Sequence, residues 1–183
     1  AVDVTLAPAL AEVLAWVVVS GGVQLDPLTE AAAVPAWELD MELEELDTLG
    51  YVARLRDGRV EARIVPCFLE AWSEDRIASM HRRLAQARRD EPDARMRHWL
   101  ACGEVALAVT AADEAAAVHM SAARFGKAKG AYAAALRAAR GCGRDDLMGP
   151  LLEGYVEAAL CDISLAAAND AEQHAARMAT EPG

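Results

Sequence analysis

The sequence predicts a mainly α protein: a winged helix (helices plus a two-stranded hairpin) followed by an all-α region of helical hairpins. Three observations predict it. Apolar residues recur at helical spacing up to residue 49, alternate with polar residues around an Asp-Gly pair at 57–58, and return to helical spacing after residue 73. We therefore expect two domains, one over residues 1–72 and one over residues 73–183.

The first two helices follow from apolar spacing and from helix-breaking residues. Over residues 7–19 one face carries Leu10, Val13, Leu14 and Val17, and a Gly-Gly pair at 21–22 then ends the helix. Asp26 is the candidate N-cap of a short second helix, because Pro27 suits the first helical position. Pro35 ends that helix.

The third helix is predicted over Trp37–Leu49, and Gly50 closes it. One face carries Leu39, Leu43, Leu46 and Leu49. The other face carries six carboxylates, Glu38, Asp40, Glu42, Glu44, Glu45 and Asp47. An amphipathic helix needs a polar side, so we interpret these carboxylates as a solvated face rather than as a metal or acid–base site.

The chain then switches to a two-residue period around Asp57-Gly58, which is typical of a two-residue hairpin loop. With that loop, Arg56 is expected opposite Arg59 and Arg54 opposite Glu61. Leu55, Ala53 and Tyr51 would then face Val60, Ala62 and Ile64. This register predicts one apolar face and one arginine-rich face, and the candidate interaction residues are Arg54, Arg56, Arg59 and Arg63.

After a connector over residues 66–72, the chain is predicted to be helical throughout. Ser73 can cap a helix whose apolar residues are Ile77, Met80, Leu84 and Ala87. Further helices are expected from Pro92, over 113–125 and 127–140 around Gly126, over 145–165, and over 169–178. Alanine-rich helices can approach closely, which suits stacked hairpins, and both a solenoid-like array and an ordinary bundle fit this pattern.

Charge is distributed unevenly along the 183 residues, whose net charge is −11. Residues 1–50 contain ten acidic and no basic residues, residues 51–100 contain eleven basic and eight acidic, and residues 101–183 contain seven basic and eleven acidic. Because neutralised phosphates supply most nucleic-acid affinity, any contact with nucleic acid must come from the middle segment.

Nothing in the sequence assembles into a catalytic, metal or cofactor site. The four cysteines and four histidines lack ligand spacing, so we expect reduced thiols and no metal. His81 is expected to pack against its helix, and the four tryptophans are expected to pack between helices. The longest apolar run is far shorter than a membrane span, and no secretory signal is visible, so we expect a cytoplasmic protein without a membrane partner.

Several runs resemble a known family: LEELDTLGYV at 43–52, WSEDR at 72–76, MHRRLA at 80–85 and GAYAAAL at 130–136. Together they resemble the winged-helix segment, and the tetratricopeptide-like helices after it, of large bacterial signal-transduction ATPases, including MalT-like regulators of the LuxR family. The resemblance covers about residues 10–140. It departs from the family pattern because no phosphate loop, no terminal LuxR-type DNA-binding motif and no histidine before His81 is present.

The resemblance implies a non-enzymatic, regulatory and protein-interaction segment of a multidomain, ATP-dependent transcriptional regulator. Its partners would be the other domains of the parent ATPase, with a further protein partner in a groove of the helical half. The alternative is a free-standing winged-helix, DNA-binding transcription factor with a helical ligand or dimerisation domain. Direct duplex binding is disfavoured because the third helix is acidic, and the oligomeric state stays open.

Overall fold

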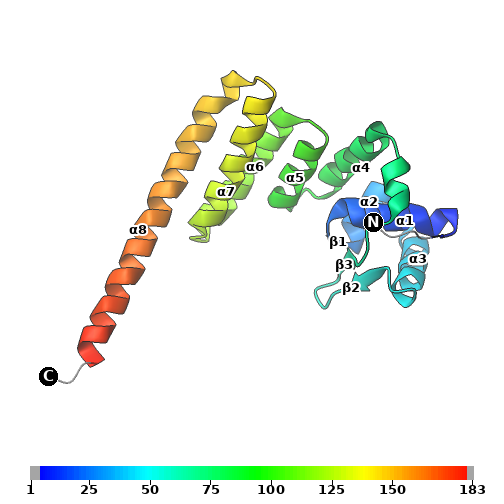
Figure 1. The fold of residues 1–183 in the computed structure, drawn as a ribbon, viewed down its shortest axis with the longest axis horizontal. Coiled ribbons are helices and arrows are strands. Elements are labelled where there is room, and N and C mark those ends of the chain that lie inside the picture. The colour runs from blue at the N-terminus through cyan, green and yellow to red at the C-terminus, as the bar shows by residue number, and fades with distance from the viewer. Residues whose placement is uncertain (1–4, 181–183) are drawn as a thin grey trace. The chain divides into compact units, whose positions relative to one another are not determined.

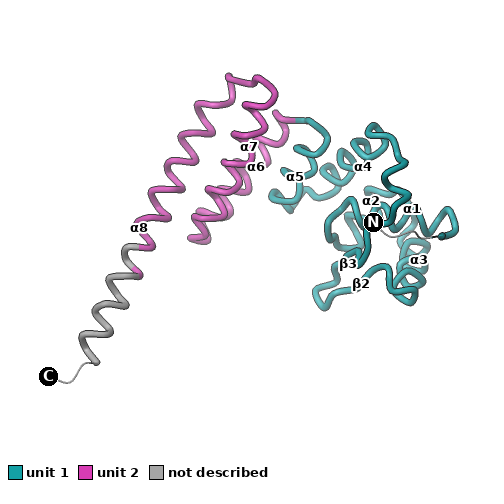
Figure 2. Tube along the Cα trace, viewed as in Figure 1, with its two compact units in different colours: residues 1–104 teal, residues 105–183 magenta. Residues whose placement is uncertain are grey.

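The computed structural model describes residues 5–180, without the side chains of residues 167, 168 and 170–180. The protein is mainly α, with a small three-stranded antiparallel sheet near the N-terminus and helical hairpins in the C-terminal part (Figure 1). It divides into two compact units, Ala1–Glu104 and Val105–Gly183 (Figure 2). None of the helices that the structure describes is both long enough and apolar enough to cross a bilayer.

The first unit contains five helices, three strands and one 3-10 turn among its described residues. In chain order they are α1 (Pro8–Ser20), β1 (Val23–Gln24), α2 (Leu25–Ala32), α3 (Ala36–Thr48), β2 (Val52–Arg54), β3 (Arg59–Ala62), the 3-10 turn Cys67–Ala71, α4 (Glu74–Ala87) and α5 (Pro92–Ala101). The strand order is β1-β3-β2. The three helices and the hairpin that the sequence predicts are present, whereas β1 was not predicted.

Strand β1 has only two residues, too few to show a period of two. It follows the turn at Gly21, whose φ is 64°, and pairs with β3 through Val23 and Val60 and through Gln24 and Arg59. Helix α2 starts directly after it, so Asp26 lies within the first helical turn and Gln24 occupies the N-cap position that we expected for Asp26.

The hairpin differs from the prediction by one residue. Ala53 pairs with Glu61 and Arg54 pairs with Val60, so the loop contains three residues, 56–58, rather than two. The Leu55 N–H donates to the Arg59 carbonyl at 2.8 Å and the Gly58 N–H donates to the Leu55 carbonyl at 3.1 Å. Gly58 has φ 82°, which is the left-handed glycine that closes a three-residue hairpin loop.

The core of the first unit explains where that unit ends. Leucines of α1, α2 and α3 are buried together with the hairpin valines: Leu14, Leu28, Leu39, Leu43, Leu46, Val52 and Val60. Met80 and Leu84 of α4 belong to the same cluster. Helix α4 therefore completes this core instead of starting a separate one, and the compact unit extends to Glu104 rather than to the expected boundary between residues 72 and 73.

Among its described residues the second unit contains three long helices, α6 (Val105–Ser121), α7 (Phe125–Gly141) and α8 (Met148–Thr180), and a 3-10 turn over Asp145–Leu147. Its buried positions are mostly alanines, including Ala112, Ala116, Ala128, Ala131, Ala135 and Ala158. Small side chains let helix axes approach closely. Ala123, with φ 54°, makes the turn between α6 and α7, whereas Gly126, around which the turn was expected, lies inside α7. The two helices expected over 145–165 and 169–178 form one continuous helix, α8.

Candidate functional site

The arginines of the hairpin were expected on one exposed face, and the observed register separates them. Arg54 lies on the same side of β2 as the buried Val52, at the outer end of the strand. It reaches back to α3, where its guanidinium binds the Asp40 carboxylate at 2.7 Å and the Asp40 carbonyl at 2.8 Å. Part of the predicted cationic cluster is thus bound to the acidic helix.

Arg59 lies on the opposite side of the hairpin. Its Nη2 is 3.5 Å from Oε2 of Glu91 and its Nε is 3.8 Å from Oδ2 of Asp57. Arg56, in the loop, and Arg63, after β3, are exposed, and neither side chain forms an ion pair with any residue that the structure describes. Of the four arginines, Arg54 and Arg59 are therefore paired within the unit, and Arg56 and Arg63 have no ion pair with a described residue.

The outer face of α3 combines carboxylates with two large apolar side chains. Trp37 is 67% exposed and Met41 is 65% exposed, although the tryptophans were expected to pack between helices. Glu38, Glu44 and Glu45 are exposed on the same helix. Burial, and then the charges of Glu38 and Glu45, raise the pKa of Glu42, as expected where carboxylates crowd one surface.

The other three tryptophans do pack. Trp16 and Trp99 are buried. Trp72 lies against Phe68 with ring centroids 6.0 Å apart, and the Arg76 guanidinium carbon lies 3.4 Å from the Trp72 ring centre. Trp37 is therefore the exception, because it precedes the apolar stripe of α3 and lies outside the core face.

A buried arginine that sequence reasoning missed joins α1, α4 and α5. The side chain of Arg88 is 1% exposed. Its guanidinium donates to the carbonyls of Ser20, at 3.0 Å, and Gly22, at 2.9 Å, and binds both carboxylate oxygens of Glu91, at 3.1 and 2.8 Å. Those carbonyls lie at the end of α1, where helical partners are lacking. The three-residue spacing of Arg88 and Glu91 indicates an ion pair, but it does not indicate that the arginine is buried.

Two histidines adjoin this arginine. Nη1 of Arg88 lies 3.5 Å from Nε2 of His98, and Nδ1 of His98 lies 2.9 Å from Nδ1 of His81. Since arginine only donates, neutral His98 accepts at Nε2 and carries its proton on Nδ1, where it donates to His81. Burial, and then the charges of His81, Arg88 and Arg97, lower the pKa of His98 to about 3. Burial also lowers the pKa of His81.

These groups do not form a catalytic arrangement. The histidine pair faces an arginine, and the hydrogen bonds of Arg88 end on two backbone carbonyls, on one carboxylate and on Nε2 of His98. Among the described residues, no group of three or more histidine, cysteine and acidic side chains is placed to hold a metal ion. The arrangement therefore serves to hold the end of α4 against the end of α1.

Comparison with known proteins gives no relative for this chain: no family model, no curated protein and no solved structure matches it.

Proposed function

We propose that this chain is a non-enzymatic regulatory and protein-interaction segment of a multidomain, ATP-dependent bacterial transcriptional regulator. In this proposal the elements from α1 to β3 are a winged helix, and the hairpins of the second unit are tetratricopeptide-like. The element order, with a helix, a short strand, two helices and a hairpin, supports the first assignment, as does the strand order β1-β3-β2.

One observation carries the proposal: the composition of the exposed face of α3. In a helix-turn-helix fold the second helix of the pair enters the major groove, and this position belongs to α3. Its exposed residues include Trp37, Met41 and Glu45, and the helix contains no cation. Carboxylates repel phosphates, whereas an exposed tryptophan is typical of the centre of a protein interface.

The ion pairs of the hairpin support the same proposal. Arg54 and Arg59 are bound to Asp40 and Glu91 of the same unit. Of the four predicted wing cations, two remain for a partner, Arg56 and Arg63. Two positive charges near an acidic helix suit a limited contact with an acidic protein surface better than a run of phosphates. The proposed partner is the nucleotide-binding domain of the parent regulator.

The competing function is a free-standing winged-helix transcription factor, and the exposure of Arg56 and Arg63 favours it. Fluorescence anisotropy with a GC-rich duplex at 50 and 200 mM salt separates the two functions. We expect no salt-sensitive duplex binding, and the Arg56→Ala/Arg63→Ala variant should behave like the wild type. A Kd below about 1 μM at the higher salt, tighter than the ~10⁻⁴–10⁻⁶ M typical of non-specific binding, would contradict the proposal.

The four-arginine variant, with Arg54, Arg56, Arg59 and Arg63 replaced by alanine, extends this test to function. If the hairpin docks on the parent's nucleotide-binding domain, the variant should deregulate the parent protein while remaining folded. If the hairpin is a DNA wing, the same variant should instead reduce the slope of log K against log salt by roughly 3 to 4. ATP turnover by the pure chain would also contradict the proposal.

A further inference from the structure

Helix α8 exposes an apolar stripe that no described residue covers. Its members are Leu152 (47% exposed), Val156 (52%), Leu160 (61%) and Ile163 (67%). The spacings of four, four and three residues place them on one side of the helix. Leu151 and Ala158 are fully buried on the side that packs within the unit. The stripe is therefore a second apolar face of α8.

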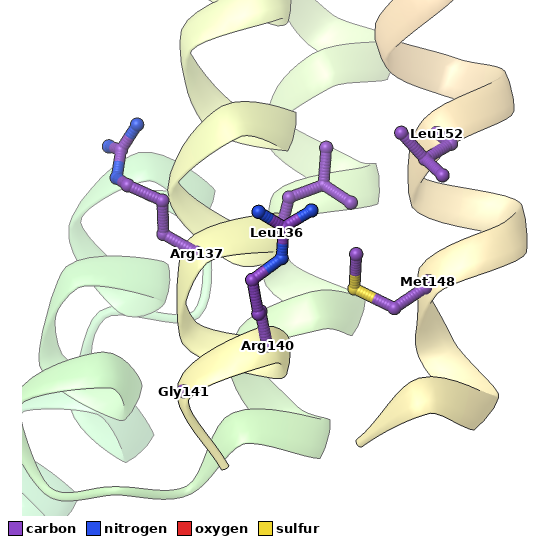
Figure 3. Close-up of a pocket in the computed structure, with 6 residues that line it drawn as sticks. All are labelled: Leu136, Arg137, Arg140, Gly141, Met148 and Leu152. Carbon is purple, nitrogen blue, oxygen red and sulfur yellow. The ribbon is translucent and has the colours of Figure 1, made fainter. Parts of the chain in front are cut away.

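One edge of the stripe borders α7. Leu136 and Arg140 of α7 line a hollow together with Met148 and Leu152 of α8. Figure 3 shows the side chains of Leu136, Met148 and Leu152 between the two helices, with Arg140 beside them on α7. This edge of the stripe is therefore apolar with a basic rim.

The other edge of the stripe is acidic. Further along α8, a second shallow hollow is lined by Leu152, Val156 and Leu160 together with Glu153 and Glu157. Each glutamate directly follows a stripe residue and so lies about 100° around the helix from it, on the side away from Met148. Arg140, Glu153 and Glu157 form no ion pair with any residue that the structure describes.

We propose that this face binds a second copy of the same chain, with the two α8 helices side by side and parallel. A two-fold axis that runs along α8 brings the basic rim of each copy to the acidic rim of the other. Arg140 lines the same hollow as Leu152, so the partner's Glu153 lies opposite it. Each stripe residue then packs against its own counterpart.

The charges select this arrangement over the antiparallel one. A two-fold axis across α8 would instead place the edge with Arg140 along the same edge of the partner, and the edge with the glutamates along the partner's glutamates, and such like-charge edges oppose association. Four apolar side chains that are about half exposed become buried in each copy, which supplies the driving force. The proposal does not depend on the function proposed for the N-terminal unit.

Light scattering coupled to gel filtration tests the proposal on the full chain. The wild type should elute with twice the 19.5 kDa mass of one chain at concentrations above its Kd, scanned up to about 0.5 mM. Val156→Glu/Leu160→Glu should elute as a monomer over the same range, because it places carboxylates in the stripe. Leu160→Gln should weaken the dimer without adding charge.

Two controls make the test specific. Val118 of α6 is 49% exposed and lies outside the stripe, so Val118→Glu should remain dimeric. Circular dichroism of each variant should match the wild type because the altered positions are exposed. A monomeric wild type throughout the range, or a dimer that survives Val156→Glu/Leu160→Glu, would overturn the proposal.

A charge exchange tests the parallel orientation. Arg140→Glu and Glu153→Arg should each raise the dimer Kd about tenfold, since the two-fold axis repeats every contact. The double variant should return the Kd to within about threefold of the wild type. If the double variant associates as weakly as the single variants, the parallel arrangement is wrong.

Discussion

Acid should destabilise the N-terminal unit through His98. This side chain is 4% exposed, and burial, followed by the charges of His81, Arg88 and Arg97, lowers its pKa to about 3. A histidine whose pKa falls on folding binds a proton more readily in the unfolded chain. Its contribution to stability is therefore complete above the unfolded pKa of about 6.5 and is lost progressively as the pH falls below that value.

The size of the effect follows from the two pKa values. Between pH 7 and pH 5 the proton taken up by unfolded His98 lowers the free energy of unfolding by about 2 kcal/mol, and the loss continues to about pH 3. His81 acts in the same direction, because its burial also lowers its pKa. Protonation at Nε2 would also direct an N–H of His98 at the Arg88 guanidinium, which adds to the cost that burial places on the charged form.

Urea unfolding followed by tryptophan fluorescence measures this loss, since all four tryptophans belong to the first unit. The wild type and His98→Gln should be compared at pH 7 and pH 5. Glutamine keeps a polar side chain but does not titrate, so the variant should lose about 2 kcal/mol less than the wild type on acidification. Equal losses, within about 0.5 kcal/mol, would refute the assignment of a lowered pKa to His98.

Three further predictions concern stability. Arg88→Met should lower the free energy of unfolding by about 3–5 kcal/mol in urea melts, because it leaves the Ser20 and Gly22 carbonyls without a donor and removes the bidentate partner of Glu91; a loss below about 1 kcal/mol would contradict the hydrogen-bonding role. Gly154→Ala should lower the melting temperature, because the added Cβ would lie 2.6 Å from Cε1 of Tyr132 and so overlap that ring. Gly149→Ala, where a Cβ meets nothing within 4 Å, should be neutral or stabilise by up to about 1 kcal/mol, and equal effects at the two glycines would count against the packing of α7 on α8. Arg54→Ala should cost at most about 1 kcal/mol, since the side chains of Arg54 and Asp40 are 39% and 50% exposed and water screens the pair, and a larger cost would show that this pair stabilises the hairpin.

The helices of the first unit could be predicted because local signals specify them. Leu39, Leu43 and Leu46 are all fully buried, as their helical spacing predicts. The hairpin was predicted from Asp57-Gly58, but its register was not, because two- and three-residue loops both use a glycine near that position. Only the ladder between β2 and β3 decides between them.

What the sequence could not predict depends on contacts between distant residues. Strand β1 forms because Val23 pairs with Val60, and these two residues are separated in the sequence by α2, α3 and β2. The burial of Arg88 depends on carbonyls nearly seventy residues earlier in the chain. Helix α4 joins the first core because Met80 and Leu84 belong to the same buried cluster as residues of α1 and α2, and no spacing within α4 indicates that.

The central claim is that the exposed face of α3 contacts a protein. A photo-crosslinking amino acid at position 41 tests it most directly, because Met41 is 65% exposed and lies one helical turn from Trp37. Irradiation of cells that naturally produce this chain should yield an adduct with a polypeptide. Adducts with nucleic acid alone, or no adduct from position 41 while a crosslinker on α8 does react, would contradict the account.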